Sequence, residues 1–96
     1  MTSRYVVTYD IADPKRLARV FRIMKGAGQH LQLSVFCCDL SPRQRESLAL
    51  ALTDVIHSTE DQVLMIELGP TDGPLAKRIT TLGRRTQIED PGPIIA

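Results

Sequence analysis

Aromatic residues are scarce in this sequence, which contains two tyrosines, two phenylalanines and no tryptophan. A core built from it must therefore be mainly aliphatic. The sequence also lacks any apolar run near the roughly 20 residues that a membrane-spanning helix requires. A strand-like pattern begins almost at the first residue and leaves no room for a signal peptide. We therefore expect a cytoplasmic protein that does not contact a membrane.

Several catalytic motifs are missing as well. There is no glycine-rich phosphate loop, no Cys/His spacing typical of a metal site and no serine hydrolase elbow. Cys37 and Cys38 are adjacent in a strand-like pattern, so their side chains point to opposite faces and fit neither a mutual disulfide nor a shared metal ion. We expect both to be small buried hydrophobic residues. His30 and His57 have no obvious partner, and each is expected to be a surface or packing residue.

The length and composition predict a single domain over residues 1–96. Hydrophobic residues make up 43% of the chain and charged residues 24%, which is ordinary for a globular protein and excludes a disordered one. A chain of this length buries roughly two thirds of its unfolded surface and can fold without metal or disulfide staples. Residues 84–96 are expected to be a C-terminal extension or an exchanged strand, because the rigid segment Pro91-Gly92-Pro93 precedes an apolar end.

Strand-like and helix-like segments alternate in the first part of the chain. Residues 4–10 are rich in Tyr, Val and Thr and predict a buried strand that ends at Asp10. Asp13 followed by Pro14 predicts a helix start, because Asp caps the first turn and Pro has no N–H to leave unpaired. The helix is expected to run to about Lys25. Its buried stripe is expected to be Leu17, Val20, Phe21 and Met24. Gly26 and Gly28 are expected to end it.

The same alternation continues further along the chain. Residues 31–40 alternate in hydrophobicity and predict a long strand, long enough to be two strands joined at a bend. A capping box from Ser41 to Gln44 predicts a second helix that ends near His57. The inward residues of this helix are expected to be Leu48, Leu52, Val55 and Ile56. Residues 62–68 predict another apolar strand, and residues 75–82 predict a short helix.

This order of elements predicts an α+β, ferredoxin-like sandwich with the helices on one face of an antiparallel sheet. The strands are apolar on both faces, so the sheet face that carries no helix needs to be covered. We therefore expect a homodimer formed through the sheet.

The charge distribution points to the first third of the chain. The net charge is +1, but residues 1–30 carry six basic and two acidic residues, whereas the remainder carries six basic and nine acidic ones. Asp10 is unusual at the end of an apolar strand and is either a turn-former or a site residue. Arg16 and Arg19 share one face of the helix that follows.

A carboxylate beside an arginine pair suits a phosphodiester substrate with a bound cation, because arginine binds phosphate through two parallel hydrogen bonds. The alternative is that Asp10 only shapes the turn with Asp13 and that Arg16 and Arg19 only form a solvated face. Pattern alone leaves both interpretations open.

Several of these residues together resemble the CRISPR-associated protein 2 family, the small subunit of the spacer-acquisition machinery. The likeness covers most of the chain and rests on Tyr9-Asp10-Ile11, Asp13, basic residues at 16 and 19, and Ser34-Val35-Phe36 after a glycine-containing loop. The conjunction of a strand ending in Tyr-Asp-Ile, a basic helix and Gln-x-Ser-Val-Phe is specific in a chain of this length.

The resemblance implies a ferredoxin-like homodimer in which Asp10 of each subunit meets its mate and holds a divalent metal, usually Mg²⁺ or else an ion such as Mn²⁺. It implies endonuclease activity on single-stranded RNA or double-stranded DNA, in spacer acquisition with an integrase partner. By the same resemblance Asp10 is the catalytic residue and metal ligand, and Arg16 and Arg19 contact nucleic acid. Ser34 and Phe36 belong to the motif near the site.

Two other functions stay open from the sequence. The same fold could act as a non-catalytic DNA-bridging scaffold of the integrase complex, in which Arg16 and Arg19 matter and Asp10 does not. The third interpretation is a small-ligand regulatory domain of ferredoxin-like fold, which predicts no salt-dependent affinity for nucleic acid.

Overall fold

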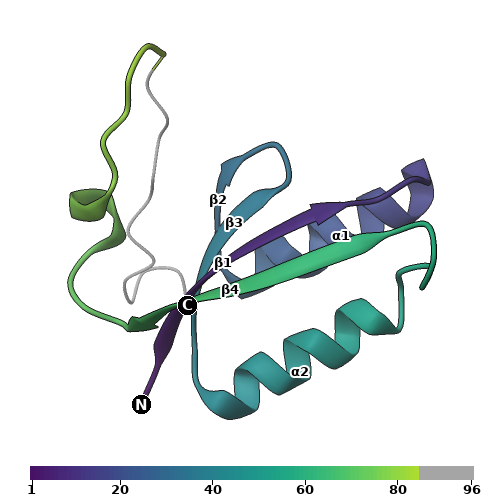
Figure 1. The fold of residues 1–96 in the computed structure, drawn as a ribbon, viewed down its shortest axis with the longest axis horizontal. Coiled ribbons are helices and arrows are strands. Elements are labelled where there is room, and N and C mark those ends of the chain that lie inside the picture. Colours follow the sequence, from purple (N-terminus) through teal and green to yellow (C-terminus); the bar gives the residue numbers. More distant parts are fainter. Residues whose placement is uncertain (85–96) are drawn as a thin grey trace.

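Four antiparallel strands form one sheet in the order β2-β3-β1-β4 (Figure 1). The structure is a computed structural model and describes residues 1–84. Its strands are β1 (Ser3–Asp10), β2 (Gln29–Gln32), β3 (Val35–Leu40) and β4 (Gln62–Pro70), its helices are α1 (Pro14–Ala27) and α2 (Pro42–Thr53), and a short 3-10 helix, η1, spans Leu75–Arg78. The predicted C-terminal extension or exchanged strand falls, apart from Arg84, on residues 85–96, which lie outside the described residues.

Both helices pack on the same face of the sheet, and this arrangement confirms the predicted ferredoxin-like sandwich (Figure 1). The buried core joins side chains of β1, β3, α1 and α2, namely Tyr5, Val7, Tyr9, Val20, Met24, Phe36, Cys38, Leu40, Leu48 and Leu52. Cys37 and Cys38 are both buried and unbonded, as predicted. No helix within residues 1–84 has the length and apolar character needed to cross a membrane.

Helix α1 begins as predicted but ends later and buries a narrower stripe. The Asp13 carboxylate accepts a hydrogen bond from the Arg16 backbone N–H at 2.9 Å, and Val20 and Met24 are fully buried. Two predictions were wrong: Gly26 lies inside the helix, and Leu17 is 39% exposed. The helix ends at Ala27 with Gly28 as its C-cap, and position 28 requires glycine because a Cβ atom there would lie 2.4 Å from the Cys37 carbonyl oxygen of β3.

The predicted long strand over residues 31–40 is two strands joined by a tight turn. The turn contains Leu33, whose φ of 25° lies in the left-handed region. Its side chain is 89% exposed, so its predicted place in the alternating pattern was wrong. The turn reverses the chain, and β2 pairs with β3 in antiparallel register, with His30 opposite Phe36.

Helix α2 confirms the predicted capping box. The Ser41 side chain accepts from the Gln44 backbone N–H at 3.1 Å, and the Gln44 side chain accepts from the Ser41 N–H at 2.9 Å. The helix ends at Thr53 and not near His57. Val55 and Ile56 still pack against the core, but from the turn after the helix.

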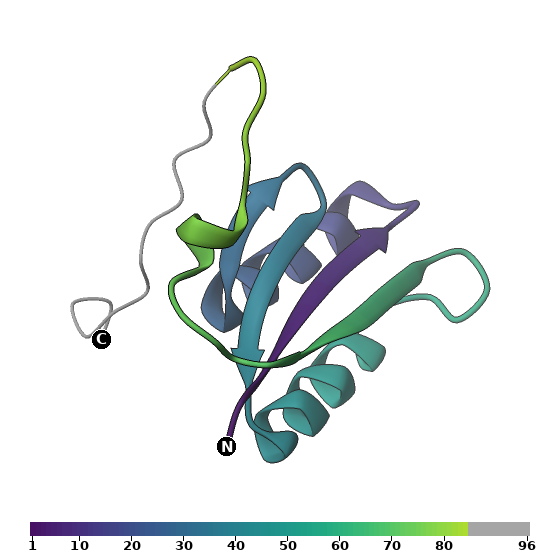
Figure 2. The ribbon, with the colours of Figure 1, turned by 60° about the vertical axis from the view of Figure 1, so that its left-hand side comes forward.

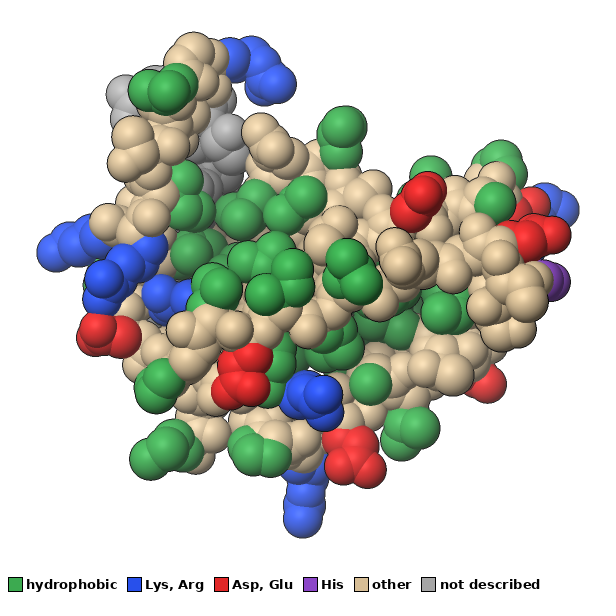
Figure 3. All heavy atoms as spheres, viewed as in Figure 1, with side chains coloured by type: hydrophobic (Ala, Val, Ile, Leu, Met, Phe, Trp, Pro, Cys, Tyr) green, Lys and Arg blue, Asp and Glu red, His purple; other side chains and the backbone are tan. Residues whose placement is uncertain are grey.

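The opposite face of the sheet is largely apolar, and neither α1 nor α2 packs on it. Alternation places Val6 and Thr8 of β1 on this face, because Tyr5, Val7 and Tyr9 point into the core. Their partners across β4 are Ile66 and Leu64, and both are 46% exposed. Hydrophobic side chains gather over the strands on the side of the molecule seen in Figure 3. We call this surface the open face.

The chain after β4 crosses the ends of β1 and β3 and carries η1 toward β2 (Figure 2). Arg4, a buried residue of β1, fixes this crossing. Its guanidinium pairs with Asp39 of β3 at 2.9 Å and donates to the carbonyl oxygen of Gly73 at 2.8 Å. Helix η1 is shorter than the helix predicted over residues 75–82.

Candidate functional site

Asp10 is the last residue of β1, and its side chain is exposed. Because Tyr9 is buried against the helices, the strand alternation places Asp10 on the open face. Gln62 is its direct partner across β4. Within residues 1–84 the Asp10 carboxylate has no hydrogen-bond or ion-pair partner. Its oxygen atoms are therefore available to a ligand.

The oxygen chemistry of Asp10 fits a hard divalent cation. Mg²⁺ prefers carboxylate oxygens, keeps several waters and often takes only one or two protein ligands. In the described part of the chain, no three His, Cys, Asp or Glu side chains are grouped to hold a metal ion. A cation at Asp10 would therefore need ligands from outside these residues, such as the Asp10 of a second copy.

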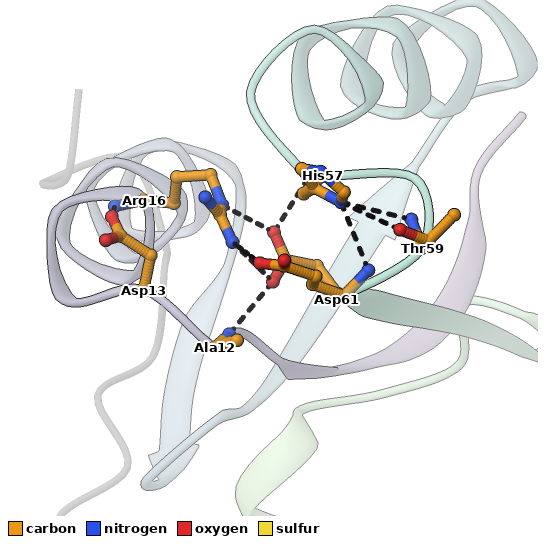
Figure 4. A network of polar contacts seen from close by, with 7 residues as sticks. Ala12, Asp13, Arg16, His57, Thr59 and Asp61 are labelled. Atoms are coloured by element: carbon orange, nitrogen blue, oxygen red, sulfur yellow. Dashed lines mark hydrogen bonds and ion pairs between the residues drawn. The ribbon is translucent and has the colours of Figure 1, made fainter.

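Arg16 lies on α1, and its guanidinium is engaged by two carboxylates of the loop before β4. Its Nε donates to Asp61 Oδ2 at 2.7 Å, and its Nη2 donates to Asp61 Oδ1 and to Glu60, both at 3.2 Å. Figure 4 shows Arg16 and Asp61 at the centre of a polar network. The side chain of Arg16 is 23% exposed, whereas that of Asp61 has no exposed area.

Asp61 accepts two further hydrogen bonds from the backbone. The N–H of Ala12 donates to Oδ1 at 2.9 Å, and the N–H of His57 donates to Oδ2 at 2.7 Å. Hydrogen bonding to Arg16 holds the pKa of the Asp61 carboxyl well below its usual range, and the two backbone donors lower this pKa further. The carboxylate therefore stays ionised and holds three segments of the chain together.

Both histidines are surface residues, as predicted, and the ring of His30 also packs on a core residue. The Nδ1 atom of His57 accepts from the backbone N–H groups of Thr59 and Glu60, at 3.3 and 3.2 Å. This shapes the loop that presents Asp61 (Figure 4). The His30 ring stacks on Phe36 with ring centroids 4.7 Å apart.

The remaining predicted residues lie in different layers of the molecule. Ser34 is brought next to the candidate site, because its carbonyl oxygen accepts from the Tyr9 N–H at 3.2 Å. Phe36 is fully buried and belongs to the core under the strand end. Arg19 is exposed on α1, in the helical layer, and within residues 1–84 it has no ion-pair partner. The structure therefore joins Ser34 and Arg16 to the chain around Asp10, but not Arg19.

Nothing in the sequence pattern singles out Asp61 as part of the site. Its partner Arg16 is 45 positions away, and no local pattern signals a pairing at that separation. The structural role of Arg4 was not predicted either, although the sequence contains a weak signal for its pairing with Asp39. An arginine in an apolar strand and an acid, Asp39, in the next strand-like segment form a complementary pair once the strands are in register.

Comparisons with known proteins agree with one another. The sequence profile described as "CRISPR associated protein Cas2" matches residues 1–72. A curated relative from Rhodospirillum rubrum, named "CRISPR-associated endoribonuclease Cas2 1", is 47% identical over 90 residues, covering 88% of each chain. One from Halalkalibacterium halodurans, named "CRISPR-associated endonuclease Cas2", is 30% identical over 95 residues, covering 94% of this chain and 96% of its own.

Solved structures share the fold. The crystal structure of Streptococcus pyogenes Cas2 at pH 6.5 superposes with a TM-score of 0.70 and 32% sequence identity, covering 83% of this chain and 99% of that one. A hypothetical protein from Thermus thermophilus, TT1823, superposes with a TM-score of 0.74 and 28% identity, covering 93% and 100% of the two chains.

Proposed function

This chain belongs to the CRISPR-associated protein Cas2 family, and we propose that it is a divalent-metal-dependent endonuclease of CRISPR adaptation. Relatives named endoribonuclease or endonuclease support the nuclease role. The proposed substrates are single-stranded RNA or double-stranded DNA, and the proposed partner is a CRISPR-associated integrase. The observation that carries this proposal is Asp10, an exposed carboxylate without a partner among residues 1–84 at the end of a buried strand.

Asp10 is the proposed catalytic residue and metal ligand, with Mg²⁺ or Mn²⁺ as the cation. When bound, such an ion supplies an activated water and offsets the charge that develops on the phosphate. The end of β1, where Asp10 is paired with Gln62 of β4 and the Tyr9 N–H donates to the Ser34 carbonyl oxygen, would hold the carboxylate in place for this task.

The second half of the site is proposed to come from a homodimer formed through the open face. Leu64, Ile66 and Leu68 are 46%, 46% and 59% exposed on β4. Leaving this much apolar surface in water is unfavourable, and a second copy of the same surface covers it by symmetry. Because Asp10 lies on the same face, the dimer would bring the two Asp10 carboxylates toward one axis.

The proposed nucleic-acid contact is made by the basic surface of α1. Arg19 is exposed, and it is the arginine of the predicted pair with no ion-pair partner within residues 1–84. The guanidinium of Arg16, by contrast, already binds Asp61 and Glu60. We therefore assign the phosphate contact first to Arg19.

The first prediction is that Asp10→Asn abolishes cleavage. The substitution keeps the size of the side chain but removes the charge that holds the cation, so we expect a loss of at least about 100-fold in rate. Cleavage of labelled single-stranded RNA and duplex DNA with Mg²⁺, and again with chelator, measures it. Asp54→Asn is the matched control, because Asp54 is an exposed carboxylate at the end of α2. Full activity of the Asp10 variant would refute the assignment.

A non-catalytic DNA-bridging scaffold is the second candidate function. It is favoured by two observations on residues 1–84: no three His, Cys, Asp or Glu side chains are grouped to hold a metal ion near Asp10, and α1 carries several basic residues. This function predicts that wild type and Asp10→Asn bind duplex DNA and the integrase equally well, and that neither cleaves any substrate with Mg²⁺ or Mn²⁺.

A further inference from the structure

Three segments that are distant in sequence converge on the buried carboxylate of Asp61 (Figure 4). They are the loop after β1, through the N–H of Ala12, the helix α1, through the guanidinium of Arg16, and the end of the turn after α2, through the N–H of His57. All four donor atoms approach within 3.2 Å. A carboxylate with this many donors has little accepting capacity left for a metal ion or a substrate.

The groups that meet at the Asp61 carboxylate lie close to Asp10, both along the chain and across the sheet. Ala12 follows Asp10 by two residues along the chain. Asp61 precedes Gln62, and Gln62 is the residue opposite Asp10 across β1 and β4. The Asp61 carboxylate therefore ties the chain just beyond Asp10 to the start of the neighbouring strand. The tie therefore joins the two segments of chain that flank Asp10 and its partner Gln62.

The charges around Arg16 oppose a contact with phosphate. Two carboxylates, Asp61 and Glu60, bond to its guanidinium, and the carboxylate of Asp13 accepts from its backbone N–H. One positive charge thus stands among three negative ones. A phosphate that approached Arg16 would meet a local excess of negative charge, which disfavours binding.

We infer that Arg16 and Asp61 form a positioning pair that fixes the Asp10 end of β1, and that Arg16 serves the site through Asp61 and not as a contact to nucleic acid. The inference rests on the proposed role of Asp10. It assigns different roles to Arg16 and Arg19, for which the sequence predicted the same role, because the guanidinium of Arg19 has no ion-pair partner within the described residues.

The test compares Arg16→Gln with Arg19→Gln in binding and in cleavage. Affinity for a labelled duplex DNA is measured over a series of salt concentrations. Arg19→Gln should lower the slope of log affinity against log salt by about 1, whereas Arg16→Gln should leave the slope unchanged. Cleavage at saturating nucleic acid should fall roughly 10- to 100-fold in Arg16→Gln, as for other residues that orient a metal ligand.

Arg16→Lys keeps the charge and covers the case in which Arg16→Gln fails to fold. One ammonium group cannot reproduce the two parallel bonds to Asp61. A positioning role therefore predicts wild-type affinity with reduced cleavage at saturation. The inference is overturned if Arg16→Gln lowers the salt slope as Arg19→Gln does, or if Arg16→Lys cleaves at the wild-type rate.

Hydrogen exchange gives a readout that does not depend on activity. The Ala12 amide should exchange faster in Asp61→Asn and Arg16→Lys, because both weaken the acceptor arrangement that holds it, and it should keep its wild-type rate in Asp10→Asn. Unchanged exchange in all three variants would refute the positioning role. If Asp10→Asn cleaves normally while Ala12 exchange rises in the other two, the proposed function fails and the structural junction stands.

Discussion

Asp10 and Asp61 are both aspartates next to a strand end, yet their surroundings give them different roles. Asp10 is exposed, and within residues 1–84 its carboxylate bonds to nothing. Asp61 has no exposed side-chain area and bonds to a guanidinium and two backbone N–H groups. Only the first is free to take up a cation. Residue type alone does not distinguish a ligand from a structural carboxylate.

Asp61 should make the stability of the protein depend on pH. Its pKa is lower in the folded chain than in the unfolded one, so its contribution is fully present above the unfolded pKa of about 4 and is lost as pH falls below that value. We expect Asp61→Asn to be clearly less stable than wild type at pH 7, with a difference that shrinks on acidification to pH 3.

Urea unfolding of both proteins at pH 7, 5 and 3 measures this difference. Asp54→Asn serves as the control, because Asp54 makes no side-chain hydrogen bond or ion pair within residues 1–84, and it should follow wild type at every pH. A difference between wild type and Asp61→Asn that grows on acidification would contradict the assigned ion pair.

At the scale of elements, the sequence predicted the starts of both helices better than it predicted where the helices and strands end. Asp13-Pro14 and the Ser41 to Gln44 capping box are local signals, and both helices start where these signals place them. Helix ends and the turn at Leu33 depend on contacts with other elements. Gly28 is the C-cap of α1, and β3 passes too close to it for any side chain; a sequence pattern does not report that distance.

The two glycines near the end of α1 should respond to alanine in opposite ways. Gly28→Ala places a Cβ atom 2.4 Å from the Cys37 carbonyl oxygen and 2.5 Å from the Cys38 sulfur, and we expect a loss of about 1–3 kcal/mol of unfolding free energy from this overpacking. Gly26 lies in the helix with no atom within 4 Å of an added Cβ. Gly26→Ala should therefore gain up to about 1 kcal/mol.

Chemical denaturation of the two variants beside wild type tests this pair, with each serving as the control for the other. Equal effects of the same sign would show that the close approach of β3 does not determine the response of position 28 to alanine.

At the scale of the whole molecule, the open face is the feature that a single chain leaves unexplained. One face of the sheet is buried by α1 and α2, whereas the other exposes a row of aliphatic side chains from β4. The described residues after β4 lie over one end of this face, where Arg4 holds them, and they leave Leu64, Ile66 and Leu68 exposed (Figures 1 and 2). The proposed dimer would both bury this row and complete the site at Asp10.

A charge in the middle of the open face should separate the proposed dimer. Ile66 lies opposite Val6 and is 46% exposed, so Ile66→Lys should fold but bury an unpaired charge at the interface. We expect the dissociation constant to rise at least about 100-fold and cleavage to be lost with it. Sedimentation equilibrium over a range of concentrations measures the association.

Leu50→Lys is the matched control for this prediction. Leu50 is 66% exposed but lies on α2, in the layer that covers the other face of the sheet. This variant should associate and cleave as wild type does. Dissociation by Leu50→Lys, with Ile66→Lys unaffected, would move the interface to the helical layer.

The sequence by itself determined the order of strands and helices, the ferredoxin-like topology, the helix caps and the position of Asp10 at a strand end. These properties follow from short-range periodicity and capping, which are encoded within a few residues. Only the tertiary structure decided that Arg16 pairs with a buried Asp61, that Arg4 holds the chain after β4, and that Gly28 and not Gly26 ends α1. Each of these features depends on residues that meet only after the chain folds. The energy of an ion pair or of a close contact is determined by the distance between the two groups and by how far they are buried, and neither quantity can be read from the sequence.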